Sequence, residues 1–168
     1  MSRLSALAVA VAVATLVVGC SSDTAEDGAD AAADGQEAVV RDVLGEVADP
    51  PGADGTTLTL VRYTVAPGAE LSPHVHPGVQ LASIESGTLS YTVESGTAVV
   101  QRADGSTEDL TGPTSTELRP GDAVEEPFDM VHFGANDTDE PVVIIATLLT
   151  PEGHDLAEDP TVTTTATA

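Results

Sequence analysis

The stretch GAELSPHVHPGVQLASIESG, residues 68–87, decides the fold class of this chain. It places His74 and His76 one residue apart, directly before a short apolar run. Successive side chains of a strand point to opposite faces, so two His residues with one residue between them lie on the same face. Two imidazoles on one face can hold one metal ion, and Gln80, at the start of the next run, can bring a third ligand. By itself this spacing is a moderate signal for a metal site.

Outward from this stretch, the hydrophobic pattern alternates as in strands, and turn residues interrupt it at short intervals. No segment has the pattern of a long amphipathic helix. The pattern predicts strands at Val39–Val47, Thr57–Val65, Val79–Glu85, Thr88–Glu94, Thr97–Arg102, Ser115–Leu118, Asp122–Glu126, Val131–Ala135 and Val142–Leu149. Many short strands at regular spacing predict an all-β sandwich or small barrel.

A second stretch, GDAVEEPFDMVHFGAN at residues 121–136, carries His132. Together the two stretches resemble the paired motifs of the cupins. The first family motif sets Gly, His-x-His, Glu and Gly at fixed spacing, and the second sets Gly, Pro-x-Gly, His and Asn. Every spacing fits here, but Gln80 stands where the family usually has Glu, and Asp129 stands where it usually has Gly. Two ordered motifs form a far more specific signal than either motif alone.

The resemblance is strongest to small single-domain cupins often described as quercetin dioxygenase-like. It implies a double-stranded β-helix, or jelly-roll barrel, and a metal site formed by His74, His76, Gln80 and His132. Three imidazoles and one amide oxygen suit Zn, Ni, Fe, Mn or Cu, so the residues leave the identity of the ion open. With four neutral ligands the ion keeps its full charge, which weakens metal retention and polarises a bound water or anionic ligand more strongly. A metal-free pocket is the alternative, because His residues can also occupy ordinary core positions.

The functional expectation is a cupin-domain protein that binds a divalent transition metal and, through it, a small oxygen-bearing ligand. An enzyme, either a dioxygenase or an isomerase or lyase acting on a small carboxylate, sugar or phenol, is one alternative. A metal-free binding or sensing module is another. No catalytic residue can be assigned from the sequence, and homodimer formation is implied by the resemblance alone.

Residues 1–19 resemble a bacterial lipoprotein signal peptide. They hold one Arg, an apolar run too short for a comfortable membrane span, and Val17-Val18-Gly19 before the only Cys of the chain, Cys20. The resemblance implies cleavage before Cys20 and lipidation of its sulfur. The mature protein would then be anchored in the cell envelope, facing outside the cytoplasm. An ordinary secretory signal with an incidental Cys is the alternative.

The net charge of the chain bears on its partners, and the composition along the chain separates a tether, a domain and a tail. The sequence holds 28 acidic residues against 5 basic ones, for a net charge of −23, which argues against nucleic acid as a partner. Residues 20–38 are acidic and lack large apolar side chains, so we expect a disordered tether there. We expect a single cupin domain over residues 39–150 and a solvated acidic, Thr-rich tail over residues 151–168, including His154.

Three further positions have orientations that the sequence leaves open. Arg62 either lines the barrel, where it could hold a carboxylate, or lies on the surface, which we favour. Tyr91 fits the core as well as a catalytic role. Glu125 and Glu126 are adjacent, so we expect them to face opposite ways.

Overall fold

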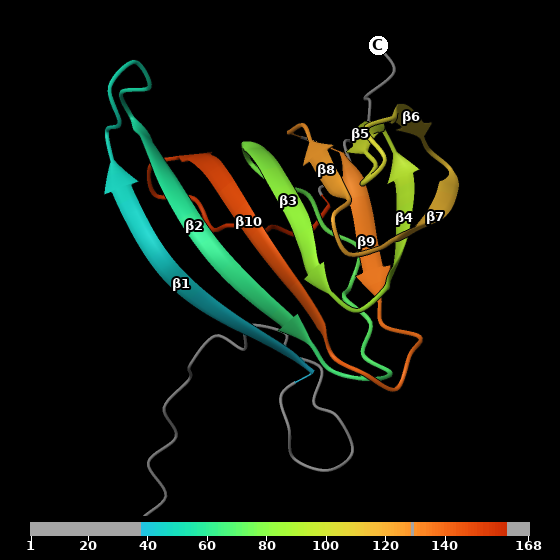
Figure 1. Cartoon of the computed structure of the whole chain (residues 1–168). Helices are drawn as coiled ribbons and strands as arrows, with labels where there is room; N and C mark the ends of the chain where they lie inside the picture. The colour runs from blue at the N-terminus through green and yellow to red at the C-terminus, as the bar shows by residue number, and fades with distance from the viewer. Residues whose placement is uncertain (1–37, 129, 161–168) are drawn as a thin grey trace, which may run out of the picture.

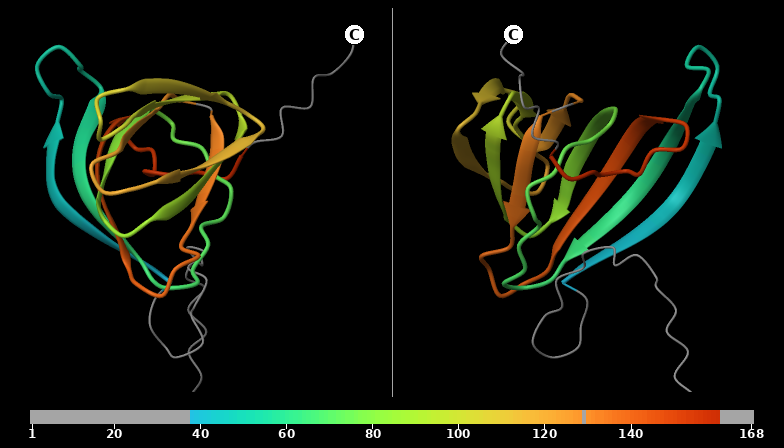
Figure 2. Two further views of the ribbon diagram at one scale, coloured as in Figure 1. Left: turned by 45° about the vertical axis from the view of Figure 1, so that its right-hand side comes forward. Right: turned by 180° about the vertical axis from the view of Figure 1, so that it is seen from behind.

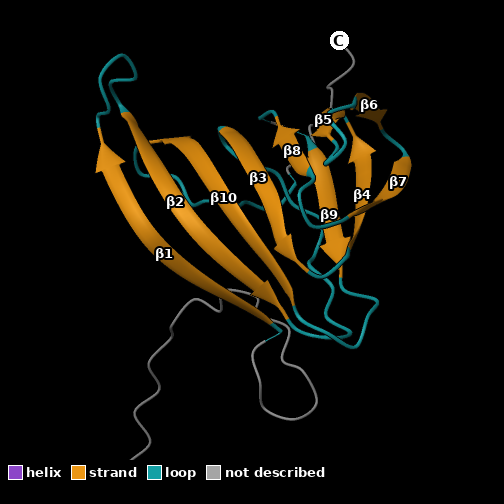
Figure 3. Cartoon of the chain, viewed as in Figure 1, coloured by secondary structure: helices purple, strands orange, loops and turns teal. Residues whose placement is uncertain are grey.

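The computed structural model describes residues 38–128 and 130–160, and these residues form ten strands (Figures 1 and 3). The strands are β1 Val39–Ala48, β2 Thr56–Val65, β3 Val79–Ser86, β4 Leu89–Ser95, β5 Thr97–Gln101, β6 Thr107–Thr111, β7 Thr114–Leu118, β8 Ala123–Glu126, β9 Val131–Ala135 and β10 Val142–Pro151. No helix occurs within these residues, and accordingly none that is long and apolar enough to cross a membrane. The predicted signal peptide, Cys20, nearly all of the predicted tether and Asp129 lie outside the described residues.

The strands form two antiparallel sheets that curve around a common core (Figure 2). The larger sheet has the order β1-β2-β10-β3-β8-β5-β6, and the smaller has the order β7-β4-β9. β1 is an edge strand that pairs with β2, and the hairpin loop between them projects from the body of the molecule (Figure 1). Non-consecutive neighbours such as β10-β3-β8 are typical of a jelly roll, as the sequence predicts.

The core consists of aliphatic side chains that alternate along the strands. In β10 every second residue is buried, from Val142 to Thr150, and the same alternation runs through β3, where Gln80, Ala82 and Ile84 face inward. This period places Gln80 on the inner face of the large sheet. The low aromatic content therefore matches a core built mainly from Val, Leu, Ile and Ala.

All the predicted strands occur, with ends shifted by at most two residues, and the structure adds β6, which was not predicted. This strand has the sequence TEDLT, and Leu110 is its one buried side chain. Because the remaining side chains are polar and exposed, β6 carries no apolar alternation to reveal it. It is an edge strand that pairs with β5.

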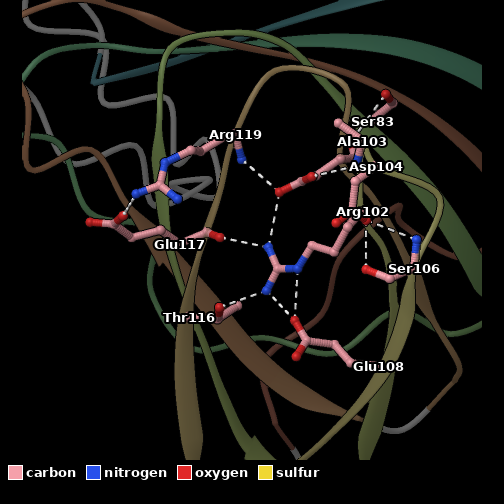
Figure 4. A network of polar contacts seen from close by, with 10 residues as sticks. Ser83, Arg102, Ala103, Asp104, Ser106, Glu108, Thr116, Glu117 and Arg119 are labelled. Atoms are coloured by element: carbon pink, nitrogen blue, oxygen red, sulfur yellow. Dashed lines mark hydrogen bonds and ion pairs between the residues drawn. The ribbon is translucent and has the colours of Figure 1, made fainter.

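An Arg-centred network joins the loop after β5 to the loop before β8 (Figure 4). The Arg102 guanidinium donates to a carboxylate oxygen of Asp122 at 2.9 Å, to the Glu117 carbonyl at 2.8 Å and to the Glu108 carboxylate. Asp122 also accepts the backbone N–H groups of Ala103 and Arg119. These bonds fix the start of β8.

The first part of the predicted tail differs from the expectation of a solvated segment. Residues 152–160 leave β10 and return to the barrel, where Glu158 exchanges two backbone hydrogen bonds with Val75, at 2.9 and 3.0 Å. Leu156 packs against the core. His154 is exposed, as predicted, and its ring pairs with Glu158. The acidic composition hid this return, because the contacts are made largely by backbone groups. Residues 161–168 lie outside the described part of the chain.

Candidate metal centre

Two segments far apart in the chain bring the predicted His residues together. His74 lies just before β3, and His132 is the second residue of β9. Their backbones exchange two hydrogen bonds, at 3.0 and 3.1 Å, so the short segment before β3 is pinned to the small sheet. His76 follows two residues later on the same face, as the alternation predicts.

The three imidazole rings form a compact cluster. Their centroids are 4.3 Å apart for His74 and His132, and 5.1 Å apart for the other two pairs. One ring nitrogen from each residue lies within 4.8 Å of the others. His76 and His132 are buried, and His74 is partly buried.

All three rings are held through Nδ1 by backbone carbonyl oxygens. His74 Nδ1 lies 2.9 Å from the Ser72 oxygen, His76 Nδ1 lies 2.6 Å from the Leu156 oxygen, and His132 Nδ1 lies 3.1 Å from the Met130 oxygen. A carbonyl oxygen only accepts, so each Nδ1 carries the proton. In the neutral ring Nε2 then keeps its lone pair, which is the arrangement that carbonyl partners impose on metal-binding His residues.

Gln80 lies beside this cluster, next to Glu126, a residue that was not predicted to belong to the site. Gln80 and Glu126 are directly paired across β3 and β8, and the Gln80 amide donates to Glu126 Oε2. Glu126 is buried, whereas Glu125 is exposed, which confirms that the two adjacent side chains face opposite ways. The same Oε2 atom lies 3.3 Å from Nε2 of His76 and 3.3 Å from Nε2 of His132.

The four neutral groups predicted for the site therefore have an anionic neighbour, because the Glu126 carboxylate lies among the imidazoles. The alternation at Glu125–Glu126 indicates that one acid faces inward. The sequence could not show that β8 lies beside β3 with Glu126 opposite Gln80, since that register depends on the crossover between distant strands.

The groups of the cluster influence one another's protonation. Burial lowers the pKa of His74 to about 4, helped by the charge of His132. Burial also opposes a charge on His132 and on Glu126, but their mutual attraction outweighs it, raising the pKa of His132 and lowering that of the Glu126 carboxyl. Glu126 is thus ionised, and a positive charge beside it is favoured.

The donor groups fit a divalent transition metal. Nε2 of His76 is buried and has no hydrogen-bond partner among the described residues, although a carboxylate oxygen lies 3.3 Å away. A lone pair facing a carboxylate is unfavourable unless a proton or a cation lies between them. Imidazole nitrogen together with carboxylate oxygen is a donor set for Zn, Fe, Mn, Ni or Cu.

The cluster lies in the wall of a cavity of about 810 Å³ that is open to one side. Tyr63, Tyr91, Arg41 and Leu118 also line it. The Tyr91 hydroxyl is buried and has no hydrogen-bond partner within the described part of the chain. Burial, together with the charge of Glu126, raises the pKa of Tyr91, so this hydroxyl stays protonated and can donate.

Arg62 does not line the cavity but lies 4.0 Å from Glu85 on the surface, which confirms the preferred orientation.

Comparison with known proteins decides the family. The family model described as "Cupin domain" matches residues 61–148, which include both His motifs. The chain is a cupin. The predicted all-β, jelly-roll cupin fold is therefore confirmed, and the His cluster of this cupin lies within the matched region.

The chain spans less than half the length of the curated relative it matches, and the solved structures are matched over widely different shares of their length. This cupin is 36% identical over 99 residues to germin-like protein 3-1 of Oryza sativa subsp. japonica, a match that covers 58% of this chain and 39% of the plant protein. A mutant of Bacillus subtilis oxalate decarboxylase is similar at 25% identity and a TM-score of 0.45, with coverage of 61% and 23%. The cupin domain of an XRE family transcriptional regulator from Enterobacter cloacae is similar at 19% identity and a TM-score of 0.45, with coverage of 68% and 99%.

Proposed function

We propose that this cupin binds a divalent transition metal through His74, His76 and His132. The observation that carries the proposal is the uniform use of Nδ1 by the three rings, which leaves Nε2 available on each of them. The family resemblance implies a further ligand at position 80, and Gln80 lies beside the three rings with its Oε1 buried and without a hydrogen-bond partner among the described residues. The identity of the ion is left open by this donor set.

The proposed ligand is a small oxygen-bearing molecule, such as a carboxylate, a sugar derivative or a phenol, that reaches the ion through the cavity. Tyr91 supports this class, because its protonated hydroxyl lacks a partner and can donate a hydrogen bond to a ligand oxygen. The cavity also has apolar walls, including Leu89 and Leu118, which suit the carbon skeleton of such a molecule.

The metal is tested on residues 21–168, which lack the predicted signal peptide and Cys20, purified without a metal-affinity tag and analysed by mass spectrometry for bound metals. We expect about one equivalent in the wild type after addition of the correct ion, and none in a His74→Ala, His76→Ala double variant. His154→Ala is the matched control, because this His is exposed and lies outside the cluster. Equal metal content in the wild type and the double variant would refute the proposal and favour a metal-free binding module.

We further propose that the protein is a lipoprotein of the cell envelope, anchored at Cys20 and facing outside the cytoplasm. The support is the sequence of residues 1–20 described above. Cys20→Ser should release the protein from membranes into the soluble fraction, with Ser21→Ala as the control that remains bound. Continued membrane association of Cys20→Ser would contradict lipidation.

An enzyme is the second candidate, either a dioxygenase or an isomerase or lyase. A carboxylate and a phenolic hydroxyl in the lining of one cavity, Glu126 and Tyr91, favour it over a purely apolar binding site, because they can bind and orient the polar groups of a reacting ligand. Oxygen uptake with phenolic probes tests the first activity, and NMR of small sugar acids tests the second. Turnover that survives the double His variant would show that the activity does not belong to this site.

A further inference from the structure

The family motif places its acidic residue at position 80, where this chain has Gln, yet a carboxylate is present in the site. We propose that Glu126 is the anionic ligand of the metal in this cupin, and that Gln80 is a positioning residue that holds the Glu126 carboxylate. The proposal deepens the proposed function and rests on it. The acid thus lies on β8, directly across the β3–β8 ladder from position 80.

Strand register carries the first step. Gln80 and Glu126 are partners in an antiparallel pair, so their side chains leave the sheet on the same face and lie next to each other. Both are buried, at 7% and 2% exposure. A carboxylate on either strand can therefore reach nearly the same point in the cavity wall.

The distances within the cluster indicate which side chain would contact a bound ion. Glu126 Oε2 lies 3.3 Å from Nε2 of His76 and equally far from Nε2 of His132, so a single oxygen is directed at both nitrogens that face the site. The Gln80 amide group donates to this same oxygen. A hydrogen bond of this kind fixes the orientation of a metal-binding carboxylate, as outer partners do in other metal sites.

Charge supports the same assignment. A divalent ion held by three neutral imidazoles keeps two positive charges, whereas a carboxylate ligand neutralises one of them in a site removed from water. Glu126 supplies this charge and Gln80 does not. With Glu126 as a ligand, the site contains one negative charge. It should therefore retain the metal more strongly than a site with four neutral ligands.

The test measures the dissociation constant of Co²⁺ by calorimetry and by its visible absorption spectrum, with circular dichroism to verify folding. Glu126→Gln keeps the shape and removes the charge. We expect its dissociation constant to rise by at least about 100-fold, because loss of an outer partner alone raises it about 10- to 100-fold. Glu125→Gln is the matched control, because the neighbouring acid is exposed, and its affinity should stay unchanged. The double variant Gln80→Glu, Glu126→Gln restores one acid and one amide in reversed places, and should bind within about tenfold of the wild type.

The outcomes separate this inference from the proposed function. If His74→Ala abolishes Co²⁺ binding while Glu126→Gln binds as the wild type does, metal binding stands and the role of Glu126 is overturned. If His74→Ala has no effect, the metal site itself is refuted. Should Glu126→Gln fail to fold, Glu126→Asp replaces it: its charge remains but its carboxylate is withdrawn by one methylene, so an unchanged affinity and spectrum would equally overturn the proposal.

Discussion

His76 and Leu156 are joined by a hydrogen bond of 2.6 Å, from the ring Nδ1 to the backbone oxygen, although 80 positions separate them in the sequence. The acidic segment after β10 thus contributes directly to the three-His cluster by holding one of its rings. The backbone pairing of Val75 with Glu158 keeps that segment in place.

Truncation after Pro151 should therefore weaken metal binding without unfolding the barrel. The truncated chain loses the carbonyl that orients His76, and loss of such an outer partner raises a metal dissociation constant about 10- to 100-fold. Calorimetry with Co²⁺ measures the change. A chain truncated after Pro160 is the control and should bind normally; equal affinity of the two truncated chains would contradict the role of Leu156.

Gly78 should not tolerate a side chain. A Cβ at this position would lie 1.9 Å from the backbone oxygen of Leu149, which cannot move without disturbing β10. Gly78→Ala should lower the free energy of unfolding by at least about 2 kcal/mol, the scale of overpacking in a core, and displace the segment that carries His76 and Gln80. Urea denaturation measures the loss. Gly45→Ala is the matched control, since a Cβ there meets nothing within 4 Å, and comparable stability of both variants would show that the segment adapts.

Asp122 should stabilise the barrel above mildly acidic pH. Burial opposes its charge, but bonds from the Arg119 and Ala103 amides and from Arg102 outweigh burial and lower the pKa of Asp122. A carboxyl whose pKa is lower in the native protein than in the unfolded chain stabilises the fold at pH values above the unfolded pKa, which is near 3.9 for Asp. This stabilisation is lost as the pH falls through the lower pKa of the native state. Asp122→Asn should cost about 1–3 kcal/mol at pH 7, as for charged hydrogen bonds, and the cost should shrink below pH 4.

Denaturation of Asp122→Asn at a series of pH values tests this dependence. Asp109→Asn serves as the control, because its side chain is exposed, and it should change stability little at any pH. A cost for Asp122→Asn that stays constant down to pH 2 would contradict the electrostatic explanation.

The two Tyr residues should resist ionisation in the native protein. Burial raises the pKa of Tyr63 to about 12 and raises that of Tyr91 as well. Because the unfolded chain ionises near pH 10, the native state retains protons that the unfolded state has lost, and stability falls as the pH rises above 10. The sequence contains two Tyr and no Trp, so ultraviolet absorption reports phenolate formation without interference. We expect phenolate to appear together with unfolding; smooth titration near pH 10 in the folded protein would contradict the burial of both rings.

The sequence predicts this fold well because apolar alternation and turn residues mark nearly every strand. It also predicts that His74 and His76 share a face, since that follows from strand geometry alone. The place of Glu126 in the site could not be predicted from the sequence. Its place beside Gln80 depends on β8 crossing over to pair with β3, and no local pattern encodes which distant strands become neighbours. β6 was missed because an edge strand of polar residues needs no apolar face.

The proposed donors of the metal centre come from the segment before β3, from β8 and from β9, so a bound ion would tie together pieces of both sheets through dative bonds. Cys20 is the sole Cys of the chain, so no intramolecular disulfide can form. The ion would be the barrel's one strong cross-link. The melting temperature of the protein would then rise with the concentration of free metal, as mass action requires. The resistance of the protein to heat and proteases would then report the metal supply of its surroundings.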